Sequence, residues 1–185
     1  MTSNPPSTIQ IRKAQPSDAA GIAQVHVESW KITYAGILPE EILARLSHNE
    51  REQRWRNILS DPDEKEFVFV AETTEGQLVG FACGGRERHG DPVYQGEVSA
   101  IYLLPRYQRQ GIGRKLMAIV AQELLRRGFR AILVWVLAAN PSRGFYEALG
   151  GCKLYEGVAH VGHGGAYPDV AYAWDDIRAL LAPHG

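Results

Sequence analysis

The chain of 185 residues has few of the features that mark disulfide-rich, metal-clustered or membrane-spanning proteins. Its two cysteines, Cys83 and Cys152, follow no metal-binding or redox spacing, and we expect both to be buried free thiols in a reducing compartment. No apolar run is long enough to span a bilayer. The formal net charge of −1 argues against a general nucleic-acid binder or a basic membrane-surface protein.

The N-terminal residues, Met1 to Pro6, lack the apolar segment that a signal peptide needs, which favours a cytoplasmic location. Residues 1–8 are polar and rich in proline, and we expect a flexible tail there. The remaining length suits one domain, which we place over residues 9–185.

Strand-like and helix-like segments are interspersed along the chain. Strands are predicted at residues 9–12, 67–71, 78–84, 97–104, 131–137, from 152 to 155, and at 171–174. Helices are predicted at residues 18–34, from 38 onwards, and at 49–59, 112–127, 141–149 and 175–181, the last capped by Asp175. A glycine- and histidine-rich loop is expected from His160 to Gly165. The segment 131–137 lacks polar alternation, so it and the strand 97–104 are predicted to form a parallel pair joined by a right-handed crossover.

The stretch from Glu97 to Arg127 is the most informative, because it reads as a strand, a tight turn and a helix. A helix that begins in glycines after a strand exposes free backbone N–H groups and the positive end of its dipole. Such an end suits a phosphate, and Arg109, Arg114 and Lys115 add positive charge beside it.

Two common phosphate-binding motifs do not fit this turn. A P-loop ends in Gly-Lys-Ser/Thr, which is missing here, and the dinucleotide fingerprint needs a third glycine where Leu116 stands. The pattern present is Gln108-x-x-Gly111-x-Gly113 directly after an apolar strand. This pattern resembles the pyrophosphate loop of the GNAT superfamily of acyl-CoA N-acyltransferases.

A second block, Asn140 to Gly151, resembles the same superfamily. There an asparagine ends a strand, and a short helix carries Phe145, Tyr146 and Glu147 before a Leu-Gly pair. The family usually ends this block in Gly-Phe, whereas this chain has Gly150-Gly151, which affects the expected local packing. The resemblance covers about residues 9–174 in element order and is specific at 97–116 and 140–151.

The resemblance implies an α+β fold: a twisted, mostly antiparallel mixed sheet of about seven strands flanked by helices. Two parallel strands, 97–104 and 131–138, would splay apart and hold acetyl-CoA as co-substrate, without a metal. The residues implied in cofactor binding are Ile101, Tyr102, Leu103, Gln108, Arg109, Gln110, Gly111, Ile112, Gly113, Arg114, Asn140, Phe145 and Tyr146. The family also suggests a homodimer.

The implied reaction is direct transfer of an acetyl group to a primary amine of a small molecule or peptide. An alkyl amine is almost wholly protonated at pH 7, so its deprotonation costs roughly 4 to 5 kcal/mol. Glu97, at the open end of the splayed strands, is the candidate general base, with an exposed strand glutamate as the alternative. The Leu103 N–H is the expected oxyanion donor, and Tyr146 is the expected acid for the leaving thiolate, with a core tyrosine as the alternative.

The acceptor site is less well marked. Trp30 and Tyr34, spaced i,i+4, and Glu97 are its candidates, with core packing as the alternative for the two aromatic residues. The residues expected to play no chemical part are His26 as a packed residue, His160 and His163 as solvated loop residues, and Arg51, Glu52, Arg54 and Arg56 as a solvated helix face.

Two other functions stay open. A non-catalytic acyl-CoA-binding regulatory module would keep the same cleft without turnover, although Tyr146 and Glu97 favour an enzyme. A plain nucleotide-binding α/β protein is disfavoured by the missing P-loop lysine and third glycine.

Overall fold

The computed structural model of the chain describes residues 8–162 and 165–182. Except for Thr8, the expected N-terminal tail lies outside the described residues. The helices are α1 Ala19–Thr33, α2 Glu40–Ala44, α3 His48–Leu59, α4 Ile112–Arg126 and α5 Arg143–Ala148. The strands are β1 Ile9–Lys13, β2 Glu66–Thr73, β3 Leu78–Arg86, β4 Gly96–Leu103, β5 Ile132–Leu137, β6 Cys152–Val161 and β7 Gly165–Trp174. Short 3-10 turns are η1 Pro16–Asp18, η2 Pro105–Tyr107 and η3 Ile177–Leu180.

The described strands form one seven-stranded sheet in the order β1-β2-β3-β4-β5-β7-β6. The pair β4 and β5 is parallel, and every other neighbouring pair is antiparallel. The helix α4 connects the parallel pair, as the apolar runs on either side of it predicted. The predicted fold class, a mixed and mostly antiparallel α+β sheet with flanking helices, is confirmed.

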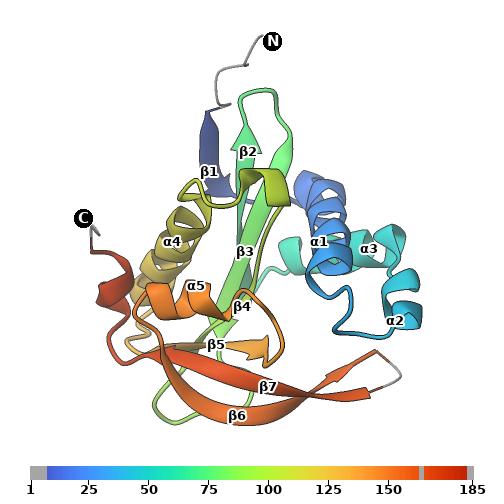
Figure 1. The fold of residues 1–185 in the computed structure, drawn as a ribbon. Coiled ribbons are helices and arrows are strands. Elements are labelled where there is room, and N and C mark those ends of the chain that lie inside the picture. The colour runs from blue at the N-terminus through green and yellow to red at the C-terminus, as the bar shows by residue number, and fades with distance from the viewer. Residues whose placement is uncertain (1–7, 163–164, 183–185) are drawn as a thin grey trace.

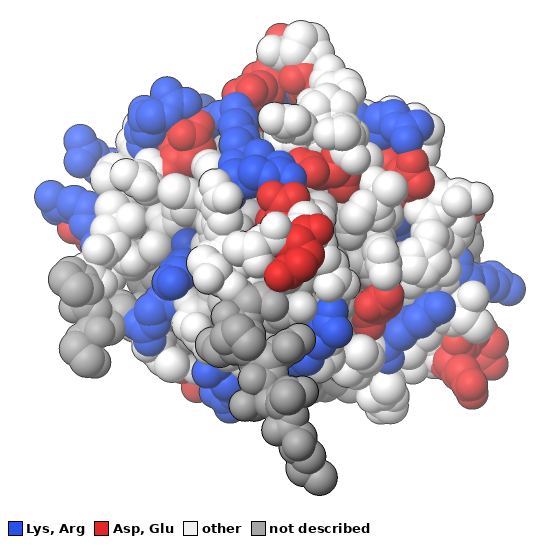
Figure 2. Space-filling model, turned by 90° about the horizontal axis from the view of Figure 1, so that it is seen from above, with Lys and Arg blue, Asp and Glu red and all other residues white. Residues whose placement is uncertain are grey.

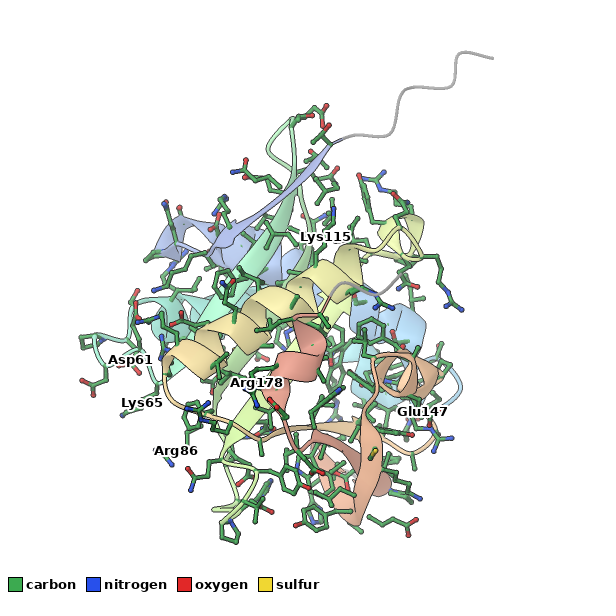
Figure 3. All side chains as sticks on the ribbon, turned by 90° about the vertical axis from the view of Figure 1, so that its left-hand side faces the viewer. Asp61, Lys65, Arg86, Lys115, Glu147 and Arg178 are labelled. Carbon is green, nitrogen blue, oxygen red and sulfur yellow. The ribbon has the colours of Figure 1, made fainter. Side chains whose placement is uncertain are left out.

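Helices cover both faces of this sheet (Figure 1). On one face α4 buries an apolar stripe against the sheet, and η3 packs beside it (Figure 3). The stripe consists of Ile112, Leu116, Met117, Val120, Ala121 and Leu124. On the other face α1 and α3 pack through a second core that includes Ile22, Trp55 and Phe81. Because each buried side chain contributes about 1.5–3 kcal/mol, the two cores fix the central strands from both sides.

The strands β4 and β5 separate soon after they begin. They pair only at Gly96–Ile132 and Glu97–Leu133, whereas β5 stays paired with β7 along its whole length. A one-residue bulge at Ser99 adds to the distortion, because Gly84 pairs with Val98 and Cys83 pairs with Ala100. The gap between β4 and β5 is therefore the expected splay.

Three local expectations were wrong. His160 lies in β6 rather than in a loop, because β6 and β7 pair up to Val161–Gly165 in one long hairpin. Asp176, not Asp175, caps the C-terminal turn by accepting a bond from the Arg178 N–H. Cys152 is exposed at the start of β6, whereas Cys83 is buried as expected.

The surface is consistent with the low net charge. On the face seen in Figure 2, Lys and Arg side chains are intermixed with Asp and Glu, and neither sign forms a continuous field. No helix within the described ranges is both long and apolar enough to cross a bilayer.

Candidate active site

The turn before α4 presents free backbone amides. The helix begins after Gly111, whose φ of 78° is left-handed, and no side chain caps this end. The first intrahelical bond runs from the Lys115 N–H to the Gly111 carbonyl at 3.1 Å, so the N–H groups of residues 112–114 have no partner within the helix. Lys115 marks this end of α4 in Figure 3. The arrangement is a ready site for a phosphate group.

Glycine at position 113 lets the turn approach the second sequence block. A Cβ built on Gly113 would lie 3.3 Å from Cε2 of Phe145, which is tighter than ordinary packing. Arg109 also adopts a left-handed φ of 60°, which is uncommon outside glycine. The two blocks that the sequence singled out therefore meet at one end of the sheet.

A cleft of about 780 Å³ follows the gap between β4 and β5. Most of the residues expected to bind the cofactor line it: Ile101, Tyr102, Leu103, Gln108, Arg109, Gly111, Gly113, Arg114, Asn140, Phe145 and Tyr146. Two others do not contribute side chains, since Gln110 donates to the Arg106 carbonyl at 2.8 Å and Ile112 is buried in the core. We call this space the first cleft.

Backbone groups of β4 face the first cleft. The Leu104 N–H donates to Val79 of β3 at 2.9 Å, so the preceding residue directs its N–H and carbonyl the other way, toward β5. The Leu103 carbonyl accepts from Gln108 Nε2 at 2.9 Å on that side. By the same alternation the N–H groups of Ile101 and Leu103 face the gap, where β5 no longer pairs with them.

Tyr146 lies in the wall of the first cleft and is only 6% exposed. Its hydroxyl makes no hydrogen bond with any described residue, although Tyr172 stacks on the ring at 5.9 Å. Burial, followed by the nearby Tyr34, raises the pKa of Tyr146 well above its usual value. The phenol is therefore a protonated and unengaged hydrogen-bond donor at neutral pH.

A second cleft of about 1040 Å³ lies against the first, and the two share Ser99, Ala100 and Tyr102. It is enclosed by residues from α1, α2, α3, β4 and the end of β6. A ligand can therefore reach the gap between β4 and β5 from either cleft, and the shared residues of β4 lie where the two clefts meet.

Aromatic side chains connect the two clefts. Trp30 Nε1 donates to the Tyr102 hydroxyl at 2.8 Å, and Asn140 Nδ2 donates to the Tyr34 hydroxyl at 3.4 Å. Trp30 and Tyr34 pack edge to face at 4.9 Å, as their spacing allowed. Trp30 lines the second cleft, whereas Tyr34 lines the first and is largely buried.

His26 forms part of the second cleft and is packed, as expected. Its Nδ1 accepts a bond from Trp55 Nε1 at 3.1 Å. Burial, followed by the positive charges of Arg51 and Arg54, lowers the pKa of His26 to about 3. The imidazole is thus neutral in the folded protein at pH 7.

We expect the neutral His26 to make folding pH-dependent. In the unfolded state His26 binds a proton below about pH 6.5, whereas in the folded state it stays neutral down to about pH 3. The contribution of the neutral His26 to the free energy of unfolding is therefore fully present above pH 6.5 and is lost as the pH falls toward 3. Between pH 7 and pH 5 the loss is about 2 kcal/mol. Urea unfolding at the two pH values should show this loss in the wild type and in the exposed-site control His48→Asn, but not in His26→Asn. An equal loss in all three proteins would contradict the assignment.

The expected position of Glu97 was wrong. Glu97 pairs with Leu133 at the closed end of the parallel strands, and its side chain is 1% exposed. It lines neither cleft, and Arg88 Nε and Nη2 donate to its two carboxylate oxygens at 3.0 and 2.6 Å. The partner that a charge in an apolar strand requires is therefore Arg88, whose own side chain lines the second cleft.

Several residues of the second cleft were not identified from the sequence. Arg51 and Arg54, expected on a solvated helix face, line this cleft, while Arg56 pairs with Glu52 on the surface as expected. Ser99 contributes a buried Oγ without a partner among the described residues. The i,i+3 spacing of the two arginines was a usable signal, because it places them on one helix face.

His160 lines the second cleft, and His163 lies outside the described residues. No group of three or more His, Cys, Asp or Glu side chains suited to a metal occurs in residues 8–162 and 165–182.

Comparison with known proteins agrees with this geometry. The sequence profile of the acetyltransferase (GNAT) family matches residues 28–151. An uncharacterised N-acetyltransferase of Bacillus subtilis, YuaI, is 38% identical over 172 residues, which are 93% of this chain and 96% of that protein. A spermidine N(1)-acetyltransferase of Thermoplasma acidophilum is 26% identical over 72% of this chain and 81% of its own length.

Solved structures show the same fold. YncA of Salmonella typhimurium, solved with its cofactor acetyl-CoA, superposes with a TM-score of 0.67 at 23% identity, covering 97% of each chain. The PaiA N-acetyltransferase of Thermoplasma acidophilum, solved with coenzyme A, has a TM-score of 0.62 at 22% identity, covering 88% of this chain and 98% of its own. From the profile match, the extended likeness to YuaI and the splayed sheet, we conclude that the chain belongs to the acetyltransferase (GNAT) family and is an acetyl-CoA-dependent N-acetyltransferase.

Proposed function

We propose that the chain transfers an acetyl group from acetyl-CoA directly to a primary amine of a small molecule or peptide, which approaches through the second cleft. The observation that carries this proposal is the placement of free amides at the start of α4 and the open Tyr146 hydroxyl along one continuous cleft. The second cleft supports it, because it meets the first at Ser99, Ala100 and Tyr102.

The residues present fit acetyl-CoA. We assign the diphosphate to the backbone amides of residues 109–114, and Arg109 and Arg114 supply charge at the rim. The pantetheine arm would lie along the unpaired backbone of residues 101–103, between Asn140 and Phe145. The thioester supplies an activated acetyl group, and the chain supplies its orientation.

We assign the stabilisation of developing negative charge to β4. The N–H groups of Ile101 and Leu103 face the gap without a strand partner, and a preorganised donor in such a site can contribute about 3 kcal/mol. The Leu103 side chain has no chemical role in this assignment, since only its backbone is used.

We assign Tyr146 to the leaving sulfur. Its raised pKa keeps the phenol protonated, so it can donate a hydrogen bond to the thiolate as it forms. The same raised pKa makes full proton transfer less favourable than in water, so hydrogen bonding is its main contribution.

We propose that the proton on the amine goes to a carboxylate other than Glu97, because Glu97 is paired with Arg88 and lines neither cleft. The carboxylates that line the second cleft are Glu41, Glu50 and Glu66. Glu66 is connected to the wall of β4, because its carboxylate accepts from the Cys83 thiol at 3.2 Å and Cys83 pairs with Ala100. We therefore propose that Glu66 accepts the proton, directly or through water, and that Glu97 positions Arg88.

Paired variants separate the two glutamates. Glu66→Gln should lower kcat/KM by about 10²-fold at pH 7, with a smaller deficit at higher pH where free amine is present. Glu97→Gln should keep the shape of the wild-type pH profile and lower the free energy of unfolding by about 2 kcal/mol, because it weakens a buried charged hydrogen bond. A flattened pH profile in Glu97→Gln alone would return the general-base role to Glu97.

Calorimetry and a thiol-release screen test the proposed reaction as a whole. Acetyl-CoA should bind with a stoichiometry of one, and free CoA should appear with at least one amine from a panel that includes amino acids, short peptides and spermidine, the substrate in one relative's name. Binding without thiol release from any amine would favour the non-catalytic regulatory module. The cytoplasmic location and the homodimer stay predictions.

A further inference from the structure

Some of the arginines that line the second cleft have a carboxylate partner, and others do not. Arg88 is committed to Glu97, but Arg51 and Arg54, both on α3, form no ion pair with any part of the chain that the structure describes. Arg51 is half-buried and lies 5.5 Å above the Trp30 ring, so its guanidinium is held inside the cleft rather than free in solvent.

Two unpaired guanidinium groups on one helix face repel each other. Burial, followed by the charge of Arg54, lowers the pKa of Arg51, and burial followed by the charges of both arginines lowers the pKa of His26. Some arginines elsewhere in the described chain, such as Arg12 and Arg127, are paired with carboxylates, whereas others such as Arg130 are not, so the distinctive feature of Arg51 and Arg54 is their place in the lining of the cleft. A half-buried, unpaired guanidinium such as that of Arg51, with the exposed Arg54 beside it, is most favourable when a ligand supplies an anion.

The cleft also holds features suited to the other end of such a ligand. Glu66 lines it and can face an ammonium group, and the unpartnered Ser99 Oγ lies where the two clefts meet. Its volume of about 1040 Å³ accommodates a molecule of amino-acid or dipeptide size. If an acceptor carries both an acid group and an ammonium group, its acid group can bind Arg51 and Arg54 while its amine stays near β4.

We propose that the acceptor is an amine that also carries an acidic group, a carboxylate or a phosphoryl group, and that Arg51 and Arg54 bind this group. The inference deepens the proposed function and rests on it. It distinguishes the chain from an enzyme that acts on polyamines, because a polyamine would place positive charge against the two free arginines.

Matched ligands test the proposal by binding alone. L-α-amino acids, their α-carboxamides, aminoalkylphosphonates and spermidine are added to the CoA-saturated protein, and the melting temperature is measured. Acid members should raise it, whereas carboxamides and spermidine should not. The double variant Arg51→Gln/Arg54→Gln should lose the acid-dependent shift but keep the shift caused by acetyl-CoA, and the control Arg130→Gln, on the exposed turn after α4, should keep both.

The same ligands are then compared by thiol release. The acid member of an accepted pair should have a KM at least tenfold below that of its carboxamide, and Arg51→Gln/Arg54→Gln should remove that difference with kcat within about threefold. Arg51→Lys should keep part of the KM difference between acid and carboxamide that the double glutamine variant loses. Arg51→Glu/Arg54→Glu should prefer carboxamides or spermidine to the acids. A preference for phosphonates over amino acids would identify the acid group as phosphoryl.

The outcomes separate the two proposals. Equal or better binding and turnover of carboxamides or spermidine would overturn the anion site and leave acetyl transfer intact. Failure of every acid member to shift the melting temperature would also overturn the anion site. Binding of acid members with loss in the double variant, but no thiol release, would support the anion site and remove acetyl transfer.

Discussion

Replacing Tyr146 by phenylalanine is expected to lower kcat by about 10²-fold while leaving the dissociation constant of acetyl-CoA within about twofold. The change removes only the hydroxyl, which makes no hydrogen bond with the described residues and faces the first cleft. The ring keeps its stack with Tyr172, so neither the wall of the cleft nor the fold should change. Steady-state kinetics with a saturating amine and calorimetry with acetyl-CoA measure the two quantities.

The neighbouring Tyr172 provides the control. Its hydroxyl donates to Glu147 at 2.6 Å and lies outside both clefts, so Tyr172→Phe should lower the melting temperature without a comparable loss of kcat. Because burial keeps the Tyr146 phenol protonated, kcat of the wild type should show no decline from its ionisation up to about pH 10. An unchanged kcat in Tyr146→Phe would leave Tyr146 as a core residue, the alternative reading of its sequence.

Substituting valine for Gly111 is expected to weaken acetyl-CoA binding by about 10²-fold or more. A β-branched residue is strongly disfavoured at the left-handed φ of 78°, so the turn must rearrange. That rearrangement moves the amides of residues 112–114, and the loss of two charge-assisted hydrogen bonds accounts for the expected factor.

The other end of α4 supplies a matched control. Gly128 has a φ of 93° and open space around its Cα, as Gly111 has, but lies after the last turn of the helix. Gly111→Val and Gly128→Val should both lower the free energy of unfolding by about 2 kcal/mol, whereas only Gly111→Val should lose affinity for acetyl-CoA. Equal affinities in the two variants would show that the α4 amides do not hold the diphosphate.

Local patterns in the sequence predicted the phosphate-binding turn, and the family resemblance that they carry implied the rest of the cofactor half of the site. A strand, a glycine turn and a helix occupy consecutive residues from 96 to 126, so their relation is fixed by short connections. The family resemblance implied that the block after Asn140 lies near the bound cofactor, and the close approach of Gly113 to Phe145 agrees with that implication. The parallel pair followed from the order of strand, helix and strand, whereas its splay was implied by the family resemblance.

The acceptor half could not be predicted in the same way, because tertiary packing assembles it. The bulge at Ser99 reverses the alternation of β4, so Val98 packs in the α4 core while Ala100 and Tyr102 pack on the opposite face. The bulge puts Glu97 on the same face as Ala100 and Tyr102, but Glu97 lies where β4 and β5 still pair, and the sequence does not show at which end the two strands separate. The partner of Glu97, Arg88, comes from the connection between β3 and β4, which the sequence marked only as a polar loop.

A crystal structure of the protein grown with CoA tests the central claim most directly. The account predicts the diphosphate oxygens within hydrogen-bond distance of the backbone amides at the start of α4, and the thiol in the gap between β4 and β5 near the Tyr146 hydroxyl. Bound CoA with its diphosphate away from those amides, or its thiol outside that gap, would contradict the account.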